Sequence, residues 1–222
     1  MRTIFKILGL IIIAVVIIAA SIYIVMWDMK KSSYSSEYEY QVEIHPDRDI
    51  YNVTVMVPLP EELSEENITA PEDWDVIFNR SISLGGIEYQ NVLVITADRI
   101  EGGSYRSVYV SMGSEDDIDT KDPWEKEPML EPKADTTEVE CDYPGTSDDV
   151  ECYEYTGEIF ARFEAGEDAR TNISVEIYGS NSWWVGGWSG NEYYDRFWRE
   201  IEGSGEGHYE TEGDVRTGMG NY

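Results

Sequence analysis

Residues 37–44 read EYEYQVEI, and their alternation is the clearest structural signal in the chain. Apolar side chains occupy the even positions, while glutamate and glutamine occupy the odd ones. A repeat of two residues belongs to a β-strand with one face buried and the other in water. The pattern returns at residues 53–57, after a turn-like segment at 45–49, and stops at residues 58–60, which read PLP. These two strands are expected to form a hairpin.

The rest of the region after residue 36 carries further strand patterns separated by turn residues. They cover residues 76–78, 87–96, 105–112, 153–163 and 173–178, and one more hairpin is expected around 208–215. Nine or ten short strands with turns between them are typical of an antiparallel sandwich, Ig-like or related. We therefore expect an all-β domain over residues 37–222, with two half-domains as the alternative.

Residues 113–150 show no strand or helix period and contain many acids and four prolines. They predict a long surface loop. Because structureless loops of this length are uncommon in compact domains, a domain boundary is the alternative.

The two cysteines, Cys141 and Cys152, lie on either side of a Pro-Gly turn and can close a small loop. Closing such a loop stabilises a fold by roughly 3 kcal/mol in the chain-entropy model. A disulfide also implies an oxidising compartment. Two unrelated buried thiols are the alternative interpretation.

The N-terminal part contains an uncharged run of 21 residues, 7–27. As a helix it would be roughly 32 Å long, which is about the thickness of the hydrocarbon layer. We expect a transmembrane helix here, behind a cytoplasmic tail of residues 1–6 and followed by a polar stalk of residues 28–36. A cleaved secretory signal is the alternative, because residues 19–21 read AAS and offer a cleavage site.

Basic residues flank the apolar run on both sides, so their count hardly orients it. Four Asn-x-Ser/Thr sequons follow the run, whereas eight Asn and 30 Ser or Thr in 222 residues predict about one by chance. The four acceptors are Asn52, Asn67, Asn79 and Asn172. Together with the cysteines they predict that the domain lies outside the cell, on a single-pass anchor in the cell membrane. The alternative is that these Asn residues have only a structural role in turns and strands.

Residues 37–222 contain 44 acidic and 12 basic residues, a net formal charge of −32. This sign excludes electrostatic binding of nucleic acid. Self-repulsion of such a charge is screened only in concentrated salt, where the screening length falls to about 3 Å at 1 M. The composition therefore indicates adaptation to high salt.

A calcium surface is the rival interpretation of the acidity, and no other cofactor is expected. The best candidate ligands are Glu115, Asp116, Asp117 and Asp119. An EF-hand loop that starts at Asp117 fails, because Lys121 stands where Asn or Asp is required and Asp122 where Gly is required.

Residues 181–194 read NSWWVGGWSGNEYY and form the densest aromatic segment. Aromatic faces beside polar side chains can stack on a sugar ring and bond its hydroxyls. The candidate binding surface consists of Trp183, Trp184, Trp188, Asn191 and Tyr193. The alternative is core packing, with the glycines allowing a tight corner. Residues 193–201 fit a helix or a strand, and the β-rich context favours the strand.

The segment also resembles a similar NSWW…GWSGNEY stretch in archaeal membrane-anchored proteins of unknown function. In that group it lies near the C-terminus of a β-rich exterior domain. The resemblance implies the same layout for this chain and brings no catalytic residues with it.

The chain shows no recognisable catalytic constellation. The stretch GWSGN at 187–191 fails as a nucleophile elbow because Asn191 stands where Gly is required. The sequence thus favours a non-enzymatic envelope protein that contacts other proteins or glycans. The alternatives are an exterior glycan hydrolase that uses two carboxylates and a structural envelope subunit.

Overall fold

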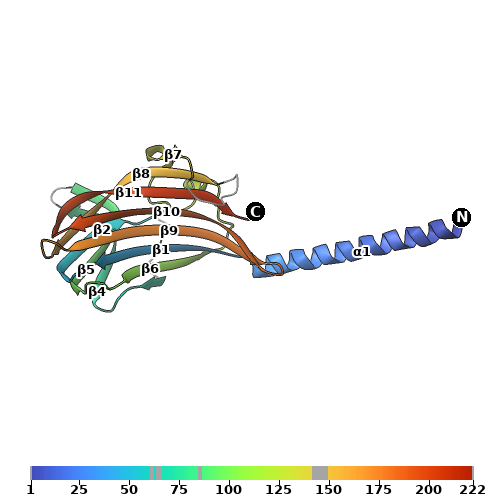
Figure 1. Cartoon of the computed structure of the whole chain (residues 1–222), viewed down its shortest axis with the longest axis horizontal. Coiled ribbons are helices and arrows are strands. Elements are labelled where there is room, and N and C mark those ends of the chain that lie inside the picture. Colours follow the sequence, from blue (N-terminus) through green and yellow to red (C-terminus); the bar gives the residue numbers. More distant parts are fainter. Residues whose placement is uncertain (1, 61–62, 64–66, 85–86, 142–149, 222) are drawn as a thin grey trace.

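The computed structural model describes residues 2–60, 63, 67–84, 87–141 and 150–221, and it consists of one long helix and one curled sheet (Figure 1). The helix is α1 (Arg2–Ser33). The strands are β1 (Ser35–Pro46), β2 (Ile50–Pro58), β3 (Ile68–Thr69), β4 (Trp74–Leu84), β5 (Ile87–Ile100), β6 (Arg106–Ser114), β7 (Thr137–Val139), β8 (Glu151–Glu164), β9 (Arg170–Trp184), β10 (Trp188–Glu202) and β11 (Gly205–Gly220). The predicted all-β fold behind one N-terminal helix is confirmed.

The strands follow the order β3-β6-β1-β9-β10-β11-β8-β2-β5-β4, and β7 pairs with β8. All the ladders between described strands are antiparallel. The sheet curls so that its two halves bury one shared apolar core. The two layers expected of a sandwich are therefore two halves of a single sheet, and the shared core favours one domain over two half-domains.

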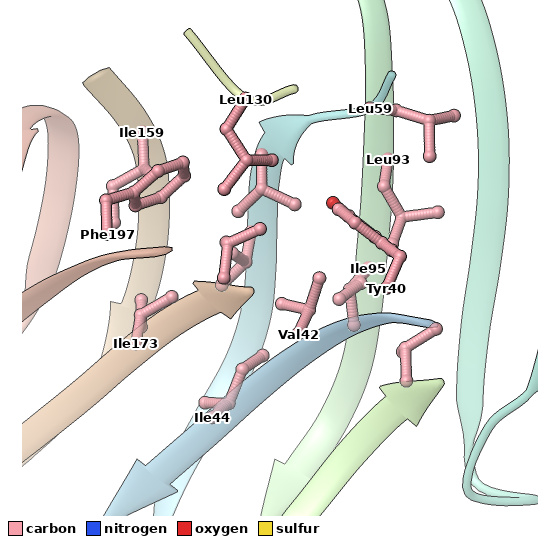
Figure 2. Close-up of a cluster of buried hydrophobic side chains, with 14 of the residues drawn as sticks. Tyr40, Val42, Ile44, Leu59, Leu93, Ile95, Leu130, Ile159, Ile173 and Phe197 are labelled. Carbon is pink, nitrogen blue, oxygen red and sulfur yellow. The ribbon is translucent and has the colours of Figure 1, made fainter. Parts of the chain in front are cut away.

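The alternation at the start of β1 is confirmed, because Tyr40, Val42 and Ile44 are fully buried. Figure 2 shows these side chains together with Leu93 and Ile95 of β5, which belongs to the opposite half of the sheet. Contacts between residues far apart in sequence thus hold the two halves together.

The predicted hairpin around residues 208–215 is wrong, because these residues lie within the single strand β11. The predicted hairpin of β1 and β2 is wrong as well. β1 pairs with β6 and β9, whereas β2 pairs with β5 and β8. The segment between them crosses from one half of the sheet to the other, and backbone bonds from Asp47 to Arg170 and from Gly103 to Pro46 hold it there. An alternating pattern reports which face is buried, but it does not name the neighbouring strand.

The described part of the excursion between β6 and β8, which reaches residue 141, is folded onto the sheet. It contains two short 3-10 turns, η2 (Pro123–Glu125) and η3 (Lys133–Asp135), besides β7. Ile118 and Leu130 are buried in the core, and Figure 2 shows Leu130 among the core side chains. The excursion therefore covers the core and does not separate two domains.

The helix α1 extends from one end of the sheet as a free rod (Figure 1). Within the described residues, Gly9–Ser33 is the one helical stretch long and apolar enough to cross a membrane. The predicted stalk is wrong, because residues 28–33 are helical and β1 begins at Ser35. Residues 28–33 contain no Gly or Pro, Lys30 and Lys31 lie at the negative end of the helix dipole, and the Ser33 hydroxyl donates to Met29 O.

Candidate functional site

The aromatic segment forms the hairpin of β9 and β10. Its strands pair in register, with Trp184 opposite Trp188 and Asn181 opposite Asn191. The interpretation of residues 193–201 as a strand is confirmed, since β10 runs from Trp188 to Glu202.

The structure does not bring the five predicted binding residues onto one surface. Trp183, Asn191 and Tyr193 are buried, whereas the exposed fraction is 38% for Trp184 and 73% for Trp188. Odd-numbered residues in the paired part of this hairpin face the interior, and the excursion covers several of them on that interior side. The expectation of a sugar platform made of all five is therefore wrong.

The buried polar residues of the hairpin hold the excursion in place. Asn181 Oδ1 accepts from the backbone N–H of Ile118 at 3.0 Å, and Asn181 Nδ2 donates to Ile118 O at 2.8 Å. Asn191 Oδ1 accepts from the Thr120 hydroxyl, and the Tyr193 hydroxyl donates to Pro128 O at 2.8 Å. These side chains thus replace the backbone partners that the excursion lacks.

Gly179 explains how the Tyr193 ring is accommodated. A Cβ at position 179 would lie 2.1 Å from that ring, so only glycine leaves room for it.

The tip of the hairpin lies against the end of α1. The Trp183 ring stacks on Tyr34 at 5.9 Å between ring centres, and Lys30 Nζ lies 4.0 Å from the centre of the Trp183 ring. The backbone N–H of Trp184 donates to the Ser33 hydroxyl at 2.8 Å. A pocket of about 630 Å³ remains at this junction, between Trp27, Trp183 and the excursion.

The outer face of β10 carries a second aromatic group, which no pattern in the sequence singles out. The Arg196 guanidinium lies 4.8 Å from the centre of the Trp198 ring and 5.4 Å from that of Tyr194. Arg196 Nη2 also donates to Asp214 Oδ1 at 3.2 Å. Arg196 is therefore fixed from three sides, and it holds the two aromatic rings in place.

Trp198 lines two open pockets on this face, one of about 500 Å³ and one of about 810 Å³. Carboxylates line both pockets. The smaller pocket has Glu200, Glu202 and Glu212, and the larger has Glu131, Asp135, Glu154, Glu212 and Asp214. Burial and the charge of Asp135 raise the pKa of Glu131. The site combines an aromatic face with many hydrogen-bond acceptors, which is a composition suited to sugar hydroxyls or to basic side chains. We name this surface the Trp198 face.

One titratable group in the interior is also missing from the sequence-based candidates. Asp195 is fully buried, and burial raises its pKa to about 7 although two donors favour its charged form. These donors are the Tyr155 hydroxyl at 2.6 Å and the Leu130 backbone N–H at 2.7 Å. The sequence does contain a signal, since Asp195 stands at an inward position of the alternating series between Tyr193 and Phe197.

The acidic patch proposed for calcium is not assembled as a ligand set. Within the part of the chain that the structure describes, no three His, Cys, Asp or Glu side chains group to hold a metal ion. Asp119 Oδ1 instead accepts from the backbone N–H groups of Lys121 and Asp122. Calcium binding by Glu115, Asp116, Asp117 and Asp119 stays a prediction.

The sequons and the cysteines are placed as follows. Asn52, Asn67 and Asn172 are exposed, and the side chain of Asn79 lies outside the described residues. Cys141 and Cys152 form a disulfide.

The fold and the site together define an all-β protein on one apolar helix, with an aromatic and acidic outer face. No protein-family model matches the chain, and no curated protein or solved structure matches it. The resemblance of residues 181–193 to archaeal membrane-anchored proteins therefore stays a prediction.

Proposed function

We propose that the protein is a membrane-anchored, salt-adapted protein of the cell envelope whose exterior β-domain contacts glycans or other envelope proteins through the Trp198 face. The observation that carries this proposal is the position of Trp198 between two open pockets lined by carboxylates. Residues of this kind bind sugars by stacking and by accepting hydrogen bonds from hydroxyl groups.

Three features support the membrane anchor and the exterior side. The apolar side chains of α1 are exposed from Leu10 to Trp27, which suits a lipid environment. The disulfide suits an oxidising compartment. The exposed acceptors Asn52, Asn67 and Asn172 are open to a glycosylating enzyme.

Replacing Trp198 by Ala is expected to weaken glycan binding about fivefold, since loss of one stacked ring costs about 1 kcal/mol. Binding would be measured on a glycan array in concentrated salt, with the full chain in detergent. The matched control is Trp188→Ala, which removes an exposed indole of the same strand and should leave binding unchanged. If the wild type binds no glycan, or if both variants bind alike, the glycan part of the proposal is wrong.

If the β-domain lies outside the cell, protease added to intact cells is expected to remove it. The exterior side also predicts that Asn52→Gln, Asn67→Gln and Asn172→Gln each lower the mass of the native protein by one glycan, measured on the intact chain. A domain that stays protected on intact cells and carries no glycan would overturn the exterior side. Glu164→Gln is the control, because Asn52 Nδ2 donates to its carboxylate while position 164 is no acceptor.

A further inference from the structure

We infer that the tip of the β9–β10 hairpin, residues 184–188, is a second membrane contact, which lies in the phospholipid headgroup layer beside α1. This inference rests on the proposed function, because it requires α1 to span the membrane. It adds a partner surface for the aromatic segment that the sequence suggested for sugars.

The first support is the position of the tip. Trp184 is bonded through its backbone to Ser33 in the last turn of α1, and Trp183 lies under Lys30. Figure 1 shows the hairpin reaching the end of the helix where the rod leaves the sheet. Trp27 and Trp183 line the same pocket, so the tip lies within reach of the helix turn that contains Trp27.

The second support is the depth in the membrane of the helix turn that contains Trp27. Trp27 ends the uncharged run, and six residues of helix separate it from Ser33, a rise of about 9 Å. The headgroup layer on each side of a bilayer is roughly 5–7 Å thick. The hairpin contact at Lys30, about 4.5 Å beyond Trp27 along the helix, therefore lies at the level of the headgroups, and the contact at Ser33 lies just outside them.

The third support is the chemistry of the tip. It reads WVGGW and carries no charge, although the domain has a net charge of −32. The turn before β9, at the opposite end of the hairpin, is acidic, with Glu167 and Asp168, and Asp117 lies beside the tip in the pocket that Trp183 lines. A turn that enters the membrane surface is more stable there when it carries no charge.

The exposed side chains of the tip are those typical of membrane interfaces. Trp188 and Trp184 extend into solvent on the same end of the molecule as Trp27, of which 61% is exposed. Indole rings concentrate at the headgroup level, where their apolar body and their N–H group are both accommodated. Lys30 and Lys31 in the adjoining helix turn provide positive charge for the lipid phosphates.

Quenching by brominated lipid tests the inference on the full chain. The protein is reconstituted into bilayers of phospholipid brominated near the top of the acyl chains, and tryptophan emission is compared with that in unbrominated lipid. With Trp27, Trp184 and Trp188 at the interface, Trp188→Phe should remove roughly one third of the quenched emission. The matched control is Trp198→Phe, because Trp198 lies ten residues along β10, about 33 Å away, and the quenched emission should not change.

The possible outcomes separate this inference from the anchor on which it rests. If Trp27→Phe lowers the quenched emission while Trp188→Phe does not, α1 is inserted and the hairpin contact is wrong. If the chain does not float with the vesicles and no emission is quenched, the membrane anchor itself is wrong. Phe is a conservative replacement at position 188, where the side chain is mostly exposed, so the variant is expected to fold.

Discussion

Replacing Asp195 by Asn is expected to remove a large pH dependence from the free energy of unfolding. In the unfolded chain this carboxyl group has a pKa near 3.9, whereas burial raises the pKa to about 7 in the folded protein. The folded state thus binds the proton more tightly than the unfolded state. The stabilisation is fully present below about pH 4 and is lost as the pH rises to about 7, in total about 4 kcal/mol.

The asparagine side chain of the Asp195→Asn variant would be neutral at every pH and similar in shape to the protonated acid. The difference in unfolding free energy between variant and wild type should therefore grow in favour of the variant as the pH is raised from about 4 to about 8. Urea denaturation at each pH, in concentrated salt to screen the surface carboxylates, measures this difference. The control is Glu154→Gln, because Glu154 is exposed on β8, next to the buried Tyr155 that contacts Asp195.

Parallel pH profiles for wild type and Asp195→Asn would contradict the raised pKa. A second variant, Tyr155→Phe, tests the cause, because it removes a hydroxyl that donates to the carboxylate. Loss of this donor should move the midpoint of the pH profile to higher pH than in the wild type, whereas a purely structural role of Tyr155 would shift stability equally at every pH.

Transfer to dilute buffer is expected to unfold the domain below about 0.5 M salt, because the screening length grows from about 3 Å at 1 M to about 10 Å at 0.1 M. Many carboxylates of the structure take a neutral partner. The hydroxyls of Tyr38, Tyr178 and Tyr153 donate to Glu127, Glu192 and Glu151. Such bonds satisfy the carboxylate oxygens without cancelling their charge, so the net repulsion remains for salt to screen.

Far-UV circular dichroism during thermal unfolding at stepped sodium chloride concentrations measures this effect. Magnesium chloride at equal ionic strength is the control, since screening depends on ionic strength. A cooperative transition at an unchanged temperature in dilute buffer would refute salt adaptation. Rescue by micromolar calcium alone would support the rival calcium site at residues 115–119.

Local pattern alone predicts the class of fold and the burial of most strand residues. The inward series in β1 is readable because Glu39 and Glu43 mark the opposite face. The pairing of strands cannot be predicted from local pattern. The chain crosses from one half of the sheet to the other at residues 47–49, and only the tertiary core selects the partner strand. The stalk prediction fails because Ser33 and Lys30 resemble linker residues, although both are compatible with a last helical turn.

The candidate site is predictable only in part. Of the five candidates, Trp184 and Trp188 are exposed, whereas Trp183, Asn191 and Tyr193 are buried. Nothing in the hairpin sequence indicates that the excursion folds back over Asn191 and Tyr193. Trp198 does not stand out from the sequence, since its role depends on Arg196 and on Asp214 of the next strand. Such cross-strand groups follow from register, which local pattern does not determine.

Only one residue separates the end of α1 at Ser33 from the start of β1 at Ser35. A tilt of the helix is therefore transmitted directly to the sheet. β1 has 12 residues and extends about 40 Å from this joint. In the proposed arrangement, a tilt of about 10° in the membrane would move the far turns of the sheet sideways by about 7 Å. Bilayer thickness, through the tilt that it imposes on α1, would thus set where the Trp198 face meets its partner.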